Sequence, residues 1–160
     1  MIGQYESPFG WIEYEKIKGS LTRVSWMNTV PAHPISDSEL QSFWSLWFQE
    51  PTVSCPFPMV LKGTPFQLAV WAQLQKIPLG HTQTYKEIAI AVGSPKAQQA
   101  VGQACKANPI TLLIPCHRVL GQNDKLTGYV GTQFLSTKQR LLEWEHRMKT
   151  LPLECKVNPT

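Results

Sequence analysis

Polar and apolar residues alternate along the chain up to about residue 30. Such alternation places every second side chain on one face of a strand, so residues 11–14 and 21–26 are predicted to form paired β-strands. Turn sequences at residues 7–10 and 18–20 separate the alternating stretches. The chain is therefore expected to begin with a small β-sheet.

The apolar spacing then changes to that of a helix. Four large apolar residues would share one helical face: Leu40, Phe43, Trp44 and Trp47. Ser36 followed by Glu39 predicts a capping box where this helix begins. We interpret the aromatic stripe as core rather than as a ligand site. Residues 51–58 contain three prolines and no periodicity, which predicts a linker between domains.

The second part of the chain carries helix start signals in quick succession. Thr64 with Gln67, and Thr84 with Glu87, predict two capping boxes. The second of them is expected to open a helix over residues 85–93, and the next helix is expected to start at residues 94–95. Two helices joined by so short a turn are typical of a helix-turn-helix.

The later helix of that pair has a small apolar face and a polar face. The residues predicted to pack inward are Ala97, Ala100, Val101 and Ala104. The opposite face would carry Gln99, Gln103 and Lys106. Gly102 and the alanines keep the helix slim, so it could approach a nucleic-acid groove closely. A plain surface helix is the competing interpretation.

The last helix is predicted to open with a capping box of Ser136 and Gln139. It places Glu145 on one face with Leu141 and Met148, so this carboxylate would be buried and would need a partner. His117 is the partner that we expect. The alternative is an exposed ion pair at the helix end, with Arg147 or Lys149.

Composition permits an anionic partner without demanding one. The 160 residues carry a net charge of +4, and 42% of them are hydrophobic. No apolar run is long enough for a membrane span, and no secretory signal is expected at the N-terminus. The four cysteines are widely spaced, which argues against a disulfide framework or a zinc site. Reduced thiols in a cytosolic protein fit best.

The richest chemistry lies at Cys116 and His117. The apolar residues 110–114 are predicted to form a short buried strand, and Pro115 breaks it just before the cysteine. A thiolate is a strong nucleophile, and an adjacent base can generate it. Taken alone, a Cys-His pair is more often structural than catalytic.

The sequence Pro-Cys-His-Arg-Val at residues 115–119 resembles the active-site motif of the O6-alkylguanine-DNA alkyltransferases, the methylated-DNA–protein-cysteine methyltransferases. Further motifs of that family follow its order and approximate spacing, at residues 63–67, 84–85, 100–102, 108–109 and 128–129. The resemblance is good over about residues 61–146 and weak over residues 1–60.

The resemblance implies a set of roles. Cys116 would accept the alkyl group, with His117 as base, Glu145 orienting the imidazole, and a water between cysteine and histidine. Tyr85 would protonate the guanine ring at N3, and Asn108 would tie the helix-turn-helix to the active-site turn. Backbone groups of Cys116, Val119 and Val130 would read the base, while Tyr129 and Gly131 would line the alkyl pocket. No cofactor or metal is implied.

The same resemblance implies a partner, double-stranded DNA containing alkylated bases, with the later helix in the minor groove. The residues expected to contact DNA are Thr84, Gln99, Gly102, Gln103, Lys106 and Arg118. The expected fold class is α+β: a small N-terminal α/β scaffold domain over residues 1–58, a mostly helical DNA-binding alkyltransferase domain over residues 59–150 with the helix-turn-helix and Cys116, and a tail over 151–160.

Three positions depart from the family pattern. Gln99 stands where the family usually has an arginine that fills the gap left by the extruded base. Val130 replaces a small residue and Thr132 a common glycine, and the loop between Tyr129 and Leu141 is about two residues longer than is typical. These changes bear on DNA affinity and pocket shape rather than on the nucleophile.

The expected function is single-turnover DNA repair, by irreversible transfer of an alkyl group from O6-alkylguanine, with O4-alkylthymine as a further substrate, to Cys116. The protein is expected to be a cytoplasmic monomer, or nuclear in a eukaryote. One alternative is a damage sensor resembling the alkyltransferase-like proteins, which bind alkylguanine and usually lack the cysteine. Another is a Cys-His hydrolase of small acyl substrates.

Overall fold

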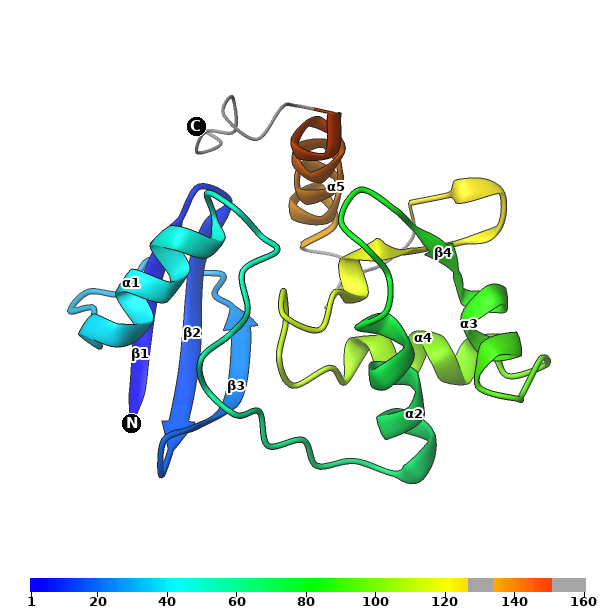
Figure 1. Cartoon of the computed structure of the whole chain (residues 1–160), viewed down its shortest axis with the longest axis horizontal. Coiled ribbons are helices and arrows are strands. Elements are labelled where there is room, and N and C mark those ends of the chain that lie inside the picture. The colour runs from blue at the N-terminus through cyan, green and yellow to red at the C-terminus, as the bar shows by residue number, and fades with distance from the viewer. Residues whose placement is uncertain (127–133, 151–160) are drawn as a thin grey trace. The chain divides into compact units, whose positions relative to one another are not determined.

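The computed structural model describes residues 1–126 and 134–150 (Figure 1). Two compact units are present, residues 1–60 with 109–111, and residues 61–108 with 112–149. The expected boundary after residue 58 falls slightly early, because Met59 forms a parallel bridge with Leu21 of the first unit. Ile110 joins that unit for the same reason, through a bridge to Val24. The α+β class is confirmed.

The first unit is built on an antiparallel sheet in the order β1-β2-β3. The expected pair is present as β2 (Gly10–Ile17) and β3 (Ser20–Trp26), with Tyr14 opposite Val24, and β1 (Ile2–Ser7) is an additional strand. One face of the sheet is buried by residues of β2 and β3: Ile12, Tyr14, Leu21, Val24 and Trp26. This face of the sheet forms one side of the core of the first unit.

The helix α1 (Ser38–Trp47) packs its apolar residues into the same core. Its aromatic stripe is confirmed as core, because the four predicted residues are all buried. The expected capping box at Ser36 is wrong. Asp37 is the N-cap, and its carboxylate accepts hydrogen bonds from the backbone N–H groups of Glu39 and Leu40. A carboxylate at a helix N-terminus is also favoured by the helix dipole.

In the second unit, the two predicted capping boxes at Thr64 and Thr84 are confirmed. Thr64 opens α2 (Pro65–Leu74) and Thr84 opens α3 (Tyr85–Ala91), each as a complete capping box with its glutamine or glutamate. Helix α2 is joined to the later helix α4 (Gln98–Lys106) by Trp71, whose indole N–H donates to the carbonyl of Ala104 at 2.9 Å. The helices α2, α3 and α4 position the residues of the site described below.

Helix α4 starts later than expected. Residues 94–97 form a turn instead, closed by a hydrogen bond from the Ala97 N–H to the Ser94 carbonyl at 2.9 Å. The buried face is consequently Val101, Ala104 and Cys105, whereas Ala100 is exposed and corrects the predicted inward set. The two-helix arrangement of α3 and α4 is present, with Gly93 in the left-handed region at the end of α3.

The predicted strand over residues 110–114 is wrong. Ile110 makes only an isolated bridge, and Leu112 adopts a φ of +78°, which no continuous strand allows. The chain turns there, and Cys116 is the first residue of a one-turn 3₁₀ helix, η1 (Cys116–Arg118), rather than the residue that follows a strand.

The last helix, α5 (Leu135–Thr150), also begins before its predicted cap. Ser136 therefore lies inside it, and the Gln139 amide donates to Glu143 at 3.2 Å instead of capping the helix. The predicted buried face of Leu141, Glu145 and Met148 is confirmed. Among the residues that the structure describes, no helix is long and apolar enough to cross a membrane.

Candidate active site

Cys116 is held in the tight turn η1 and is almost fully buried, with 2% of its surface exposed. Its backbone N–H donates to the carbonyl of Ile114 at 2.8 Å, and the N–H of Arg118 donates to that of Pro115 at 3.0 Å. Pro115 donates no hydrogen bond itself and so marks where the turn begins. The thiol is thus fixed by a rigid piece of backbone.

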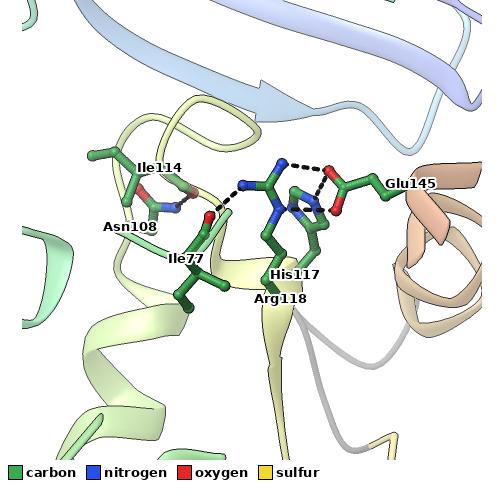
Figure 2. A network of polar contacts seen from close by, with 6 residues as sticks. All are labelled: Ile77, Asn108, Ile114, His117, Arg118 and Glu145. Carbon is green, nitrogen blue, oxygen red and sulfur yellow. Dashed lines mark hydrogen bonds and ion pairs between the residues drawn. The ribbon is translucent and has the colours of Figure 1, made fainter. Parts of the chain in front are cut away.

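Asn108 holds this turn from the end of α4. Its side-chain amide donates to the Ile114 carbonyl at 2.7 Å and to Sγ of Cys116 at 3.2 Å (Figure 2 shows the contact with Ile114). The contact between Asn108 and the active-site turn, expected from the sequence, is confirmed. A donor aimed at the sulfur favours negative charge there.

His117 and Glu145 meet as the helical spacing predicted. The imidazole Nε2 lies 2.9 Å from Oε2 of Glu145, and the two side chains are 0% and 1% exposed. Because Nε2 faces the carboxylate, Nδ1 is the ring nitrogen through which His117 can act as a base on the other side. The geometry is that of a base and the group that orients it.

Arg118 is a second partner of Glu145, and here the prediction of a DNA contact is corrected. Its Nε and Nη2 donate to the two carboxylate oxygens at 2.8 and 2.7 Å, and Nη1 donates to the Ile77 carbonyl at 2.7 Å (Figure 2). The residue is buried, so its guanidinium is used inside the protein. The alternative of an exposed ion pair at the helix end is wrong, because Glu145 is buried and paired with His117 and Arg118.

The electrostatics of the site follow from burial and these contacts. Burial alone would raise the pKa of Glu145, but its contacts with His117 and Arg118 lower that pKa to about 2. Burial raises the pKa of the Cys116 thiol to about 11, against the opposing effects of Asn108 and Lys138. Glu145 is therefore a permanent anion, whereas Cys116 rests as a neutral thiol.

Lys138 was missed by the sequence reasoning. It is fully buried, and its Nζ donates to the Val119 carbonyl at 2.6 Å. The signal was present, because Lys138 precedes Leu141 by three positions and Glu145 by seven, on the buried face of α5. Buried lysines are rare, and apolar periodicity does not report them.

Tyr85 reaches the site through a short parallel pair, β4 (Gln83–Thr84) with β5 (Val119–Leu120). This pairing joins the start of α3 to the residues that follow η1. Beside it lies a pocket of about 340 Å³. The pocket is lined by residues of α3, α4 and the loop after β5: Thr84, Tyr85, Lys86, Gln98, Gln99, Gly102, Gly121, Gln122 and Asn123.

Four of the residues predicted to act on the base or on DNA thus share one hollow: Thr84, Tyr85, Gln99 and Gly102. A side-chain Cβ at Gly102 would lie 4.0 Å from the Tyr85 ring, an ordinary contact, so internal packing does not require glycine there. Gln103 and Lys106 are exposed on α4 but do not line the pocket. The predicted pocket residues Tyr129, Val130 and Gly131 lie outside the described residues.

A comparison with protein families decides the relationship. Residues 65–147 match the model described as "6-O-methylguanine DNA methyltransferase, DNA binding domain". The chain belongs to this methyltransferase family. The constitutive methylated-DNA–protein-cysteine methyltransferase of Bacillus subtilis is 39% identical over 144 residues, covering 80% of this chain and 85% of the relative. That of Methanosarcina acetivorans is 39% identical over 150 residues, covering 88% and 95%.

Solved structures of methyltransferases share the fold over nearly the whole chain. The Mycobacterium tuberculosis O6-methylguanine methyltransferase has a TM-score of 0.80 at 32% identity, covering 96% of this chain and 98% of that one. The Mycobacterium tuberculosis protein OGT in complex with DNA has a TM-score of 0.78 at 35% identity, covering 91% and 92%. Within residues 1–126 and 134–150, this methyltransferase has no cluster of His, Cys, Asp or Glu suited to a metal ion.

Proposed function

We propose that this protein repairs DNA by moving an alkyl group from O6 of guanine, or O4 of thymine, directly and irreversibly to Cys116. One observation carries the proposal: a buried thiol hydrogen-bonded by Asn108 stands next in the chain to a His117–Glu145 pair, in a chain of the methyltransferase family. The family relatives named for the same reaction support it.

The transfer balances as a single displacement. The Cys116 proton leaves to His117 through an intervening water, and a sulfur electron pair forms the new S–C bond. The C–O6 bond breaks, and its electrons stay on guanine, which takes a proton at N3 from Tyr85. These steps leave an imidazolium at His117 and a tyrosinate at Tyr85, and proton exchange with solvent returns both to neutral, so that in sum one proton passes from sulfur to guanine. The thioether product has no facile leaving route, so each molecule acts once.

Because Cys116 rests as a neutral thiol, a base must remove its proton before or during transfer. Because burial raises the pKa of Cys116 to about 11, thiolate is scarce at neutral pH, and the proton must be removed as the alkyl carbon approaches. Glu145, fixed as an anion by Arg118, stabilises the imidazolium that forms on His117. The site thereby couples deprotonation to the presence of substrate.

DNA is the proposed partner, and the target base must leave the stack to reach a buried thiol. Exposed Gln99 and the open position at Gly102 place α4 against the pocket, with Gln103 and Lys106 facing outward for the DNA backbone. The net charge of +4 is compatible with this partner. We propose a monomer without cofactor, acting in the cytoplasm, or in the nucleus of a eukaryote, with residues 1–58 as scaffold.

A non-transferring damage sensor and a Cys-His hydrolase remain the alternatives, and both are disfavoured. Binding alone, as in a damage sensor, does not require a thiol held by Asn108 beside a base. Hydrolysis of a small acyl substrate does not require the pocket lined by α3 and α4.

The function is tested by incubating the protein with duplex DNA that carries radiolabelled O6-methylguanine. Label should move to the protein, Cys116→Ser should bind the duplex without accepting label, and the matched control Cys55→Ser should do both. Cys55 is a fair control because it is half-buried and belongs to the first unit, whereas the residues of the site belong to the second. Transfer that persists in Cys116→Ser would overturn the assignment.

A further inference from the structure

Lys138 is the one fully buried lysine among the described residues, and the mechanism above does not use it. Burying an ammonium group is costly unless nearby groups compensate its positive charge and accept hydrogen bonds from its three N–H donors. Its side chain runs from α5 to the Val119 carbonyl, where Nζ donates at 2.6 Å. That carbonyl belongs to the segment directly after Cys116–Arg118, so the lysine holds the active-site turn to α5.

Two of the groups around Lys138, Tyr85 and Cys116, lose protons in the proposed reaction. Its Nζ lies 5.9 Å from the ring centroid of Tyr85, which comes from α3. The thiols of Cys116 from η1 and Cys105 from α4 are close enough to raise its pKa, while burial, the larger effect, lowers that pKa to about 8. At neutral pH the side chain is therefore mainly a cation.

We propose that Lys138 is a positioning residue for alkyl transfer: its ammonium fixes the Val119 carbonyl and stabilises the negative charge that develops on Cys116 and on Tyr85 as each gives up its proton. The inference rests on the proposed function. It assigns to α5 two contributions, the anion Glu145 on the side of His117 and the cation Lys138 on the side of the sulfur.

The effect of the Lys138 charge can be separated from that of its hydrogen bond to the Val119 carbonyl. Lys138→Gln keeps a donor for the Val119 carbonyl and removes the charge, and Lys138→Met removes both at similar length. Lys149→Met removes an exposed lysine from the same helix and serves as the control. If only the hydrogen bond mattered, glutamine would restore the activity that methionine loses.

Iodoacetamide measures the thiol without DNA, through the rate at which Cys116 is alkylated at pH 7, where Lys138 is mainly charged, and the labelled duplex measures transfer. Lys138→Gln and Lys138→Met should both slow the alkylation of Cys116 about tenfold at this pH, which corresponds to the lower end of the effect of a nearby opposite charge. Both should slow transfer about tenfold at the same pH, with Lys149→Met unchanged. Unchanged rates of alkylation and transfer in Lys138→Gln would overturn the proposal.

A second measurement needs no change at Lys138, and so stands if those variants fail to fold. The rate of Cys116 alkylation in the wild-type protein should rise about tenfold per pH unit below pH 8 and level off above it, because Lys138 then loses the charge that favours the thiolate. A rate that keeps rising with the same slope through pH 8 would overturn the coupling. Absence of methyl transfer in the wild-type protein would instead overturn the proposed function, and the alkylation profile would be unaffected.

Discussion

Glu145 connects two residues that stand side by side in the chain, His117 and Arg118. A buried carboxylate is destabilising unless it is paired, and the always-charged guanidinium of Arg118 gives Glu145 a permanent positive partner. Arg118 is itself fixed by the Ile77 carbonyl after α2. The orientation of the base is therefore set by a network that spans α2, η1 and α5.

A double-mutant cycle measures whether His117 and Glu145 act as one unit. His117→Ala and Glu145→Gln should each slow methyl transfer by about 10²-fold or more, the usual scale for a general base. The double variant should be only slightly slower than either single one, because removing one partner already disables the other. Single-turnover rates on duplex O6-methylguanine provide the measurement, and losses that multiply would show that Glu145 does not act through His117.

For single residues, the sequence predicted the contact between His117 and Glu145, but it assigned Arg118 to DNA rather than to Glu145. Glu145 was found because two apolar neighbours at helical spacing require it to face inward, and His117 was expected as a suitable partner. Arg118 was misassigned, since arginines are usually exposed and its partner Ile77 lies 41 positions away. Only the folded position of α2 reveals that the guanidinium is enclosed.

Among the elements, α4 presents a neutral residue to the pocket where the family usually has an arginine. Gln99 lines the hollow beside Tyr85 and is exposed. Extruding a base costs a few kcal/mol, which is offset by whatever fills the vacated stack. Glutamine is shorter and uncharged, so weak DNA binding with a shallow salt dependence is expected of the natural protein.

Gln99→Arg should speed transfer from duplex DNA, and should speed transfer from free O6-benzylguanine much less, because no base is extruded there. The matched control is Gln103→Arg, which adds the same charge to the same helix outside the pocket. Both variants should steepen the slope of log affinity against log salt by at most about one unit. Equal acceleration on the free base would place Gln99 in the alkyl pocket instead.

Local signals decided which elements the sequence could predict. Capping boxes at Thr64 and Thr84 are short-range chemistry, and both were found where expected. The start of α4 and the turn at Leu112 carry no such signal: Ala97 offers no side-chain cap, and a leucine at positive φ is held there by its surroundings. The apolar run before Cys116 consequently looked like a strand.

For the molecule as a whole, the ionised Glu145 ties stability to pH. Its pKa is lowered from 4.5 to about 2 in the folded protein, so its contribution is complete above pH 4.5 and is lost as pH falls toward 2. The free energy of unfolding should exceed that of Glu145→Gln by a constant amount above pH 4.5, and the excess should shrink below it. Urea unfolding across this range provides the measurement, and an excess independent of pH would contradict the ion pair.

The central claim, that one buried thiol takes the alkyl group once, is tested most directly by peptide mass spectrometry. The protein is mixed with an excess of duplex carrying isotopically labelled O6-methylguanine and digested after the reaction stops. The account predicts one labelled methyl group per molecule, on the peptide that contains Cys116, and no further loss of lesion from the DNA. Label on Cys55, Cys105 or Cys155, or lesion loss beyond one per protein molecule, would contradict it.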